Sequence, residues 1–184
     1  WHDQWYTSSK DGAFQRENAQ RRNALPAAEA GRYHLYVSLA CPWAHRTLIM
    51  RRWKKLEGAI SLSIVDPFMG DDGWTFSDAP GAIADSVNGA KCLWEVYKKA
   101  LPDYTGRVTV PVLWDKKTGT IVNNESREII RMLDVEFDAV GDASVSYCPE
   151  ELRAEIDSTI DALYQPVNNG VYRAGFAVSQ RAYD

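Results

Sequence analysis

The chain alternates hydrophobic and polar positions in two segments and spaces its apolar residues as a helix does between them. Residues 33–39 (YHLYVSL) and residues 60–65 (ISLSIV) alternate and are rich in β-forming residues, so each is expected to form a strand. Residues 43–56 place their apolar side chains on one helical face, and Gly58 is positioned to end that helix. Two strands joined by a helix of this length form a βαβ unit, which predicts parallel strands with a right-handed crossover.

The pattern after residue 90 predicts four more elements. They are a helix at 91–101, strands at 110–115 and 120–122 around a glycine-containing turn, and a helix at 127–133. The resulting order, β-α-β-α-β-β-α, is that of a thioredoxin-like α/β domain, which is assigned to residues 32–134. A long loop rich in Gly, Asp and Pro, residues 68–90, interrupts this domain, and loops of such length inside a compact domain are often functional.

The regions on either side of this domain lack its order. Residues 1–31 are polar and poorly periodic, and we interpret them as an N-terminal extension that lies over the domain without joining its core. Residues 135–148 are expected to form a linker. Pro149 begins a new helical region, because proline suits the first turn of a helix. Two helical segments cannot enclose a core alone, so residues 149–184 are expected to be the start of a helical C-terminal domain that is cut short at the end of this sequence.

Composition narrows the possible classes of function. The 184 residues are 45% hydrophobic and 25% charged, as in soluble globular proteins, and no run of about 18 apolar residues is present to span a membrane. The 21 basic and 25 acidic side chains give a net charge of −4, which argues against a nucleic-acid partner. The three cysteines form no C-x-x-C pair, so neither a disulfide scaffold nor a metal site is expected. This cysteine usage predicts a reducing, cytoplasmic location.

Cys41 is the most informative residue for chemistry. It stands between the first predicted strand and the helix that follows, where unpaired backbone N–H groups favour a thiolate over a thiol. Pro42 suits the first helical turn because its missing N–H would have had no partner there. Ala44 occupies the position of the second cysteine in a dithiol motif, which favours single-cysteine chemistry with glutathione over protein disulfide exchange. The alternative interpretation is a buried cysteine that acts as a small hydrophobic residue.

Two further motifs could bind a peptide-like ligand. Val110-Pro111 precedes a predicted strand, and a cis bond there would expose backbone groups with which glutathione could pair as an added short strand. Glu125 could bind an ammonium group, while Ser126 could cap the next helix, whose N–H groups would receive a carboxylate. The γ-glutamyl end of glutathione carries both of these groups. The alternatives are an ordinary trans proline and a helix cap without a ligand.

Three isolated residues are weaker candidates. Trp74, in the long loop, could close over a ligand, although a loop tryptophan is more often simply packed. Arg107 could meet a carboxylate, against the default of a solvated arginine. Tyr172 could deliver a proton to a leaving group, or it could be a packed tyrosine. The remaining residues with reactive side chains are interpreted as a helix-surface histidine, a core cysteine and an inert cysteine: His45, Cys92 and Cys148.

Five motifs of the chain resemble those of one known family. They are GRYHLYVSLACPWAHR at 31–46, GWTF at 73–76, GRVTVPVLWD at 106–115, NES at 124–126 and NNGVYRAGF at 168–176. On these motifs the chain resembles the glutathionyl-hydroquinone reductases, the xi class of glutathione transferases, in order over residues 31–184. The resemblance implies a thioredoxin-like domain followed by an all-α glutathione-transferase C-terminal domain, in a protein that is usually a homodimer.

The resemblance also implies a reaction and the residues that perform it. Cys41 corresponds to the nucleophile, and Tyr172 corresponds to the proton donor beside the quinone ring. The positions that correspond to glutathione contacts are Trp74, Arg107, Val110, Pro111, Glu125 and Ser126. In the family, the cysteine attacks the sulfur of a glutathionyl-hydroquinone, which forms a cysteine–glutathione mixed disulfide and frees the hydroquinone. A second glutathione then releases oxidised glutathione and restores the thiolate, so glutathione is the expected co-substrate.

Two other functions stay open at this point. An omega-type thiol transferase or dehydroascorbate reductase shares the Cys-Pro start of the helix. A glutathione-binding module without turnover is the other alternative, because the family continues beyond the position of Asp184 with helices that carry further tyrosines of its aromatic pocket. The presence of Cys41 and Tyr172 counts against this last alternative.

Overall fold

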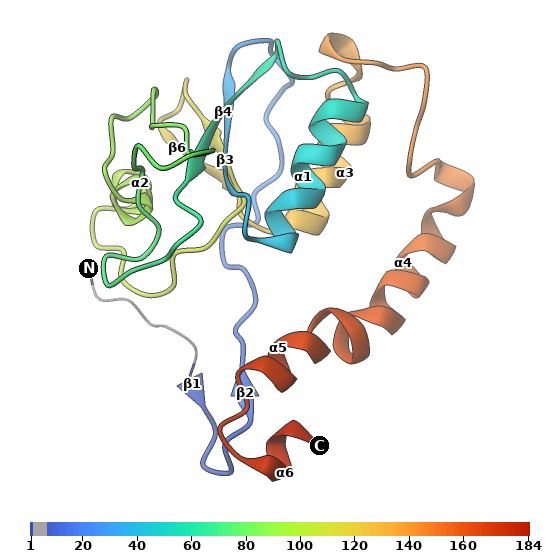
Figure 1. The fold of residues 1–184 in the computed structure, drawn as a ribbon. Helices are drawn as coiled ribbons and strands as arrows, with labels where there is room; N and C mark the ends of the chain where they lie inside the picture. The colour runs from blue at the N-terminus through green and yellow to red at the C-terminus, as the bar shows by residue number, and fades with distance from the viewer. Residues whose placement is uncertain (2–6) are drawn as a thin grey trace. The chain divides into compact units, whose positions relative to one another are not determined.

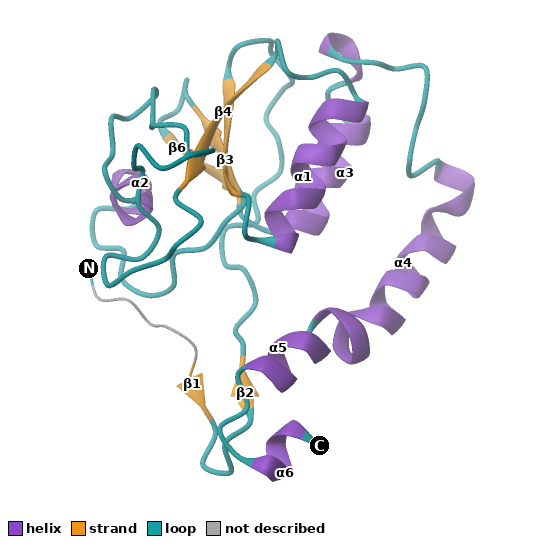
Figure 2. Ribbon diagram, viewed as in Figure 1, coloured by secondary structure: helices purple, strands orange, loops and turns teal. Residues whose placement is uncertain are grey.

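The computed structural model describes Trp1 and residues 7–184, which group into two compact units. The first unit comprises Trp1 and residues 19–147, and the second comprises residues 7–18 together with residues 148–184. A four-stranded sheet with helices makes up the first unit, and a short hairpin with helices makes up the second (Figure 1 and Figure 2).

The sheet forms the centre of the first unit. Its strands are β3 (Tyr33–Ser38), β4 (Ile60–Val65), β5 (Val112–Asp115) and β6 (Thr120–Asn123), and they lie in the order β4-β3-β5-β6. The helices are α1 (Pro42–Trp53), α2 (Leu93–Ala100) and α3 (Ser126–Val135), and a 3₁₀ turn, η1 (Asp138–Val140), follows them. β3 and β4 are parallel, whereas β5 is antiparallel to both β3 and β6. α1 and α3 lie on one face of the sheet and α2 on the other (Figure 1). The predicted order β-α-β-α-β-β-α and the thioredoxin-like fold are therefore confirmed.

β3 is the strand around which this unit is built. All six of its residues are buried, because strands pair with both of its edges and helices cover both faces of the sheet. Its polar side chains therefore find partners inside the sheet, and His34 lies between the hydroxyls of Ser61 and Ser63 on β4. β3 ends at Ser38, and the chain then turns into α1, which places Cys41 at the carboxyl end of a central strand.

Part of the N-terminal extension joins the core, contrary to the expectation from its polar composition. Leu25 is only 9% exposed and belongs to the hydrophobic core of the first unit. The preceding residues pair with β6, where the Asn23 N–H donates to the Val122 carbonyl at 3.0 Å. The Asn124 N–H donates to the Arg21 carbonyl at 2.8 Å. β6 is the last strand of the sheet, so its outer backbone groups need such a partner.

Several helix boundaries differ from the sequence prediction. α1 ends at Trp53, before the predicted end at residue 56, because Lys55 adopts the left-handed region with φ of +53°. Leu56 is nevertheless completely buried, so its place in the apolar pattern reflects core packing rather than helical structure. In the second unit, a 3₁₀ turn, η2 (Glu150–Leu152), follows Pro149 and comes before the next α-helix.

The second unit combines a short hairpin with the C-terminal helices. Its remaining elements are β1 (Thr7–Ser8), β2 (Phe14–Gln15), α4 (Arg153–Leu163), a π-helical turn, η3 (Tyr164–Asn168), α5 (Gly170–Gly175) and α6 (Gln180–Tyr183). The Ser179 hydroxyl donates to the Asp11 carbonyl at 2.8 Å. The Val178 N–H donates to the Gly12 carbonyl at 3.2 Å. The turn of the hairpin is therefore bonded directly to the segment that leads into α6.

Candidate functional site

The chemistry of the first unit centres on Cys41, which is half-buried at the junction of β3 and α1. Its backbone is extended, with φ of −102° and ψ of 115°, and Pro42 follows as the first helical residue. Unpaired N–H groups and the positive end of the helix dipole therefore lie at this end of α1. The Cys41 Sγ atom is 3.8 Å from the carbonyl oxygen of Val110, which precedes Pro111 through a cis peptide bond. The structure thus brings together the predicted nucleophile and one of the predicted glutathione contacts.

Tyr97, on α2, connects the two chain segments that carry the other predicted contacts. Its hydroxyl donates to the Thr109 carbonyl at 2.8 Å and accepts a bond from the side-chain amide of Asn124 at 3.0 Å. Burial raises the pKa of Tyr97, so its phenol stays protonated and keeps donating. One hydroxyl therefore fixes the residue before Val110 and the residue before Glu125. The helical spacing of Tyr97 marked it only as a core residue, so the sequence did not reveal this role.

Glu125, and not Ser126, caps α3. Glu125 has extended backbone at the position before the helix, and its carboxylate accepts a bond from the Arg127 N–H at 3.1 Å. Ser126 is instead the first residue of the helix and is only 3% exposed. The expectation that Ser126 would be the cap is therefore wrong, because the chain enters the helix one residue earlier than a serine cap requires. Its hydroxyl has a different partner.

That partner is Arg46, one turn into α1. Its Nε and Nη2 atoms donate to the Ser126 hydroxyl oxygen at 3.0 and 2.6 Å. The same guanidinium lies 3.6 Å from the Glu125 carboxylate, and its carbon is 4.9 Å from the centre of the Trp43 ring. α1 and α3 begin at the same end of the sheet, so a long side chain on one reaches the start of the other (Figure 1). Sequence reasoning missed Arg46, and the available signal was its position shortly after Cys41.

Trp74 and Arg107, the other predicted glutathione contacts, lie in two loops that Trp1 also meets. The Trp1 indole N–H donates to the carbonyl of Gly106, next to Arg107, at 3.0 Å. A side chain placed on Gly73, next to Trp74, would meet the Trp1 ring at 3.7 Å. Trp74 itself packs against the core as a partly buried residue. The roles of Trp74 and Arg107 toward glutathione stay predictions.

Tyr172, the predicted proton donor, belongs to the second unit and lies on α5. Its ring stacks with the rings of Phe14 and Phe176 at centroid distances of 6.0 and 6.1 Å. The Arg16 guanidinium lies 5.4 Å from the centre of the same ring and donates to the Asn169 side chain at 3.4 Å. These contacts hold the phenol within an aromatic cluster. Its predicted role in catalysis stays a prediction.

The remaining reactive side chains follow the sequence interpretation with one exception. His45 is exposed on α1, as expected, and Cys148 is buried. Cys92 is not a core residue: it is half-buried at the position before α2, because that helix begins two residues later than its predicted start at residue 91. Burial, with the carboxylates of Glu95 and Asp72, raises the pKa of Cys92. This thiol is therefore mostly protonated at neutral pH.

Among residues 7–184, no helix is both long and apolar enough to cross a lipid bilayer. No group of three or more His, Cys, Asp or Glu side chains arranged to hold a metal ion occurs in the part of the chain that the structure describes.

Comparison with known proteins places the chain in a family. Residues 40–136, more than half of the chain, match the model of the glutathione S-transferase N-terminal domain. The chain belongs to the glutathione S-transferase family. Among its relatives in this family, it is 54% identical over 199 residues to the glutathionyl-hydroquinone reductase YqjG of Escherichia coli (strain K12), covering 100% of this chain and 61% of that protein. It is 53% identical over 188 residues to the glutathionyl-hydroquinone reductase PcpF of Sphingobium chlorophenolicum, covering 100% of this chain and 60% of that protein.

Another member of the glutathione S-transferase family bears a different name. The chain is 46% identical over 187 residues to the glutathione S-transferase omega-like 2 of Schizosaccharomyces pombe, covering 96% of this chain and 60% of that protein. The chain therefore spans about 60% of the length of the curated relatives that it matches.

Solved structures of this family agree with the sequence comparison. The glutathione-S-transferase Xi from Phanerochaete chrysosporium matches with a TM-score of 0.91 and 50% identity, over 96% of this chain and 60% of that one. The glutathione-bound structure of YqjG from Escherichia coli K-12 matches with a TM-score of 0.85 and 53% identity, over 100% of this chain and 59% of that one. The resemblance to the xi class that the sequence motifs indicated is confirmed.

Proposed function

We propose that this chain carries the glutathione-binding and thiol-reactive part of a glutathionyl-hydroquinone reductase. The observation that best supports the proposal is Cys41 at the start of α1, with its sulfur 3.8 Å from the Val110 carbonyl. Only the thiolate form of cysteine attacks another sulfur, and a helix N-terminus favours that form. Two relatives of the chain are named glutathionyl-hydroquinone reductases.

Glutathione is the proposed co-substrate, in a reaction that uses no metal. We expect its backbone to pair with that of Val110, beside Pro111, as a short added strand. Its γ-glutamyl carboxylate would be received at the start of α3, and its ammonium group would pair with Glu125. Both bonds between Arg46 and Ser126 use the serine oxygen as acceptor, so the Ser126 hydroxyl keeps its own hydrogen for the ligand carboxylate.

The outer part of the proposed glutathione site comes from the loops. Trp74 would close over the bound tripeptide, and Arg107 would meet one of its carboxylates. The bond from Trp1 to the Gly106 carbonyl supports this assignment, because it holds the backbone next to Arg107.

The proposed reaction runs through one mixed disulfide. The Cys41 thiolate attacks the sulfur of the glutathionyl group, so a new S–S bond forms as the bond between that sulfur and the aromatic carbon breaks. The electron pair of the broken bond stays with the ring carbon, which takes up a proton that Tyr172 is proposed to deliver. The hydroquinone leaves. A second glutathione thiolate then attacks the mixed disulfide, which yields oxidised glutathione and restores the Cys41 thiolate.

Mass spectrometry of a single turnover tests this proposal. The 184-residue chain is mixed with one equivalent of a glutathionyl-benzohydroquinone, and the expected product is Cys41 carrying one glutathione, with release of benzohydroquinone. Cys92→Ser serves as the matched control and should form the same adduct. A Cys41→Ser variant that still releases hydroquinone would overturn the assignment of the nucleophile.

Two alternative functions predict other outcomes. A thiol transferase or dehydroascorbate reductase is favoured by the omega-like name of one relative. It would turn over a small mixed disulfide with glutathione faster than it turns over the glutathionyl-hydroquinone. A binding module without turnover would bind glutathione in calorimetry and form no Cys41 adduct with the conjugate.

Three further properties of the whole protein are proposals of the same kind. We expect it to act as a homodimer and to reside in the cytoplasm, with small glutathionyl-hydroquinones as its partners and with neither nucleic acid nor membrane among them. We also propose that residues 32–134 are the glutathione-binding domain, that residues 135–148 are a linker and that residues 149–184 begin the helical domain.

A further inference from the structure

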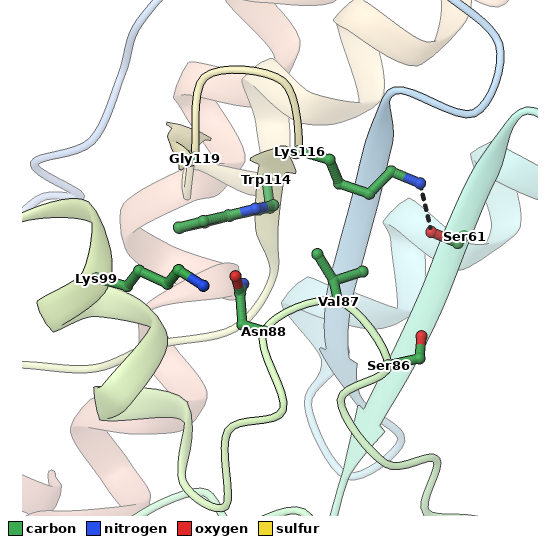
Figure 3. Close-up of a pocket in the computed structure, with 8 residues that line it drawn as sticks. All are labelled: Ser61, Ser86, Val87, Asn88, Lys99, Trp114, Lys116 and Gly119. Carbon is green, nitrogen blue, oxygen red and sulfur yellow. Dashed lines mark hydrogen bonds between the residues drawn. The ribbon is translucent and has the colours of Figure 1, made fainter.

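The first unit contains a pocket of about 560 Å³ at the end of the sheet opposite Cys41. Its lining side chains come from β4, from the loop before α2, from α2 and from the β5–β6 hairpin: Ser61, Ser86, Val87, Asn88, Lys99, Trp114, Lys116 and Gly119 (Figure 3). Ser61 pairs with His34 near the beginning of β3, whereas Cys41 follows the end of the same strand. We call this cavity the lysine pocket, after Lys99 and Lys116, and its volume lies in the range of small-molecule binding sites. It is separate from the proposed glutathione site.

Two lysines give the lysine pocket its charge. Lys99 reaches it from α2 and Lys116 from the hairpin, and the residues that line it include no carboxylate (Figure 3). Among the described residues, Lys99 has no ion-pair partner, and the Lys116 ammonium meets only the Ser61 hydroxyl, at 3.5 Å. The chain as a whole carries a net charge of −4, so this positive charge is local.

The wall of the lysine pocket holds a third donor. Trp114 is only 1% exposed, and its indole stands between the two lysines (Figure 3). In the part of the chain that the structure describes, no acceptor bonds to its Nε1–H. This Nε1 atom is not among the described buried polar atoms that lack a partner, so the N–H is open to the pocket. An acceptor on a ligand could therefore bond to it.

Asp85, the residue before Ser86, is bonded within the loop and to the sheet. It accepts bonds from the Tyr36 hydroxyl and from the backbone N–H groups of Val87, Asn88 and Ala90. These bonds fasten the loop onto the sheet, and among the described residues Asp85 forms no ion pair with Lys99 or Lys116. The pocket wall is therefore fixed by a buried network and is positively charged.

A second set of bonds, between His34 and the hydroxyls of Ser61 and Ser63, determines how Ser61 faces the pocket. The hydrogen positions in this set leave the Ser61 oxygen as an acceptor toward the pocket. The Ser63 hydroxyl donates to the Ala84 carbonyl at 2.8 Å, so its oxygen must accept the bond from His34 Nε2 at 2.9 Å. His34 Nδ1 then carries no hydrogen and accepts from the Ser61 hydroxyl at 2.7 Å. The remaining lone pairs of Ser61 serve Lys116, which steadies one ammonium group without neutralising its charge.

We propose that the lysine pocket binds a small oxyanion, the phosphate or carboxylate group of a small molecule, through Lys99, Lys116 and the Trp114 indole. Phosphate and carboxylate oxygens are the acceptors that ammonium and indole donors share. Three donors, none of them paired with a carboxylate among the described residues, converge on a cavity large enough for more than the anionic group alone. This inference goes beyond the proposed reductase function and does not depend on it.

Titration of the full 184-residue chain with pyrophosphate and, separately, with succinate tests the inference. The readouts are calorimetry and the indole N–H signal of Trp114 in a ¹H–¹⁵N spectrum. We expect at least one anion to bind with Kd below about 1 mM and to move that signal, as a charge-assisted site should. Binding of pyrophosphate alone would identify a phosphate ligand, and binding of succinate alone would identify a carboxylate ligand.

Variants distinguish the pocket from general surface charge. Lys99→Gln and Lys116→Gln should each weaken binding by about tenfold, because each removes one charge-assisted bond. Lys98→Gln, on the same helix but outside the pocket, should change it less than about twofold. Circular dichroism verifies that each variant is folded. The inference is overturned if neither anion moves the Trp114 signal at about 10 mM, or if the Lys99→Gln/Lys116→Gln double variant binds as well as the parent.

Discussion

Cys41 and Cys92 occupy equivalent positions on two helices of the first unit, and their surroundings differ in charge. Each residue has extended backbone directly before the first helical residue. The first turn of α1 contains no acidic residue, whereas that of α2 contains Glu95, whose carboxylate accepts bonds from the N–H groups of Lys91 and Cys92 at 2.6 and 3.3 Å. On α1 the nearby charge is instead the guanidinium of Arg46.

This difference separates the effect of the helix N-terminus on a cysteine from the effect of burial and nearby charge. A helix N-terminus offers its N–H groups to any acceptor, but at α2 the Glu95 carboxylate also lies there, because it accepts from the N–H groups of Lys91 and Cys92 just before the helix. Burial together with that carboxylate then raises the pKa of Cys92. The position before a helix is therefore not sufficient to make a cysteine reactive, because burial and a neighbouring carboxylate can outweigh the effect of the helix N-terminus.

The largest expected effect is on glutathione binding and comes from removing the guanidinium of Arg46, the charged group near Cys41. Arg46→Met removes the two bonds to Ser126 and the contact with Glu125, where the proposal places the γ-glutamyl group. Bonds to a charged group contribute about 1.5 to 3 kcal/mol, so the Kd for glutathione measured by calorimetry should rise about 10- to 100-fold.

Two further variants separate this positioning role from a merely structural one. Arg46→Lys should restore only part of the affinity, because an ammonium cannot reproduce the paired N–H geometry. Arg52→Met removes an exposed arginine of the same helix that pairs with Glu57, and it should leave the Kd unchanged. An Arg46→Met protein with parental affinity would show that the start of α3 does not receive the ligand.

The second effect is the pH dependence of Cys92. Its raised pKa keeps the thiol protonated beyond the ordinary range, so the rate of its alkylation by iodoacetamide should still be rising with pH above the ordinary pKa of a cysteine, about 8.5. The same shift means that burial of the neutral thiol favours the folded state below the pKa of the unfolded chain. This contribution to the free energy of unfolding is lost as the pH rises from the pKa of Cys92 in the unfolded chain through its higher pKa in the folded chain. A rate that levels off below pH 8.5 would contradict the assignment.

A smaller effect is expected from placing a carboxylate on α1. His45 is exposed in the first turn after Cys41, so His45→Glu adds negative charge without disturbing the core. We expect alkylation of Cys41 at pH 7 to slow by about 3- to 10-fold, because the new charge disfavours the thiolate. His45→Gln has nearly the same size without the charge and should keep the parental rate. Equal rates for both variants would mean that charge near the helix start has no influence on this sulfur.

The smallest expected effect is the converse change on α2. Glu95→Gln removes the charge and keeps an oxygen that can accept from the N–H groups of Lys91 and Cys92, so alkylation of Cys92 at pH 8 should rise about 2- to 5-fold. Burial is the larger cause of the raised pKa and remains in this variant, which limits the gain. Peptide mapping reads the rate at Cys41 in the same sample as an internal control. A slower reaction at Cys92 would contradict the charge argument.

Sequence pattern predicted the order of strands and helices and the position of Cys41, because these depend on local periodicity. Residues 60–65 form a strand at the bounds that alternation predicted, and the hairpin around the glycine turn is present. The same local reasoning misplaced Cys92, since an apolar pattern of period 3.6 does not show where a helix begins.

The unpredicted parts of the site depend on contacts between residues that are distant in the chain. Arg46 reaches Ser126, and Tyr97 reaches both Thr109 and Asn124, through side chains whose partners no spacing rule identifies. The lysine pocket has the same origin, because the residues that line it come from four separate segments. Periodicity identifies which residues are buried, but not which buried polar atom meets which.

The pairing of residues 21–23 with β6 determines how short a usable version of the first unit can be. These residues occupy the hydrogen-bonding positions that a neighbouring molecule would otherwise take. A chain trimmed to begin at Tyr33 would keep every strand of the sheet and lose this cover, together with the buried side chain of Leu25. Such a trimmed chain would expose the unpaired backbone groups at the outer edge of β6. We therefore expect it to self-associate through this edge and to keep its sheet.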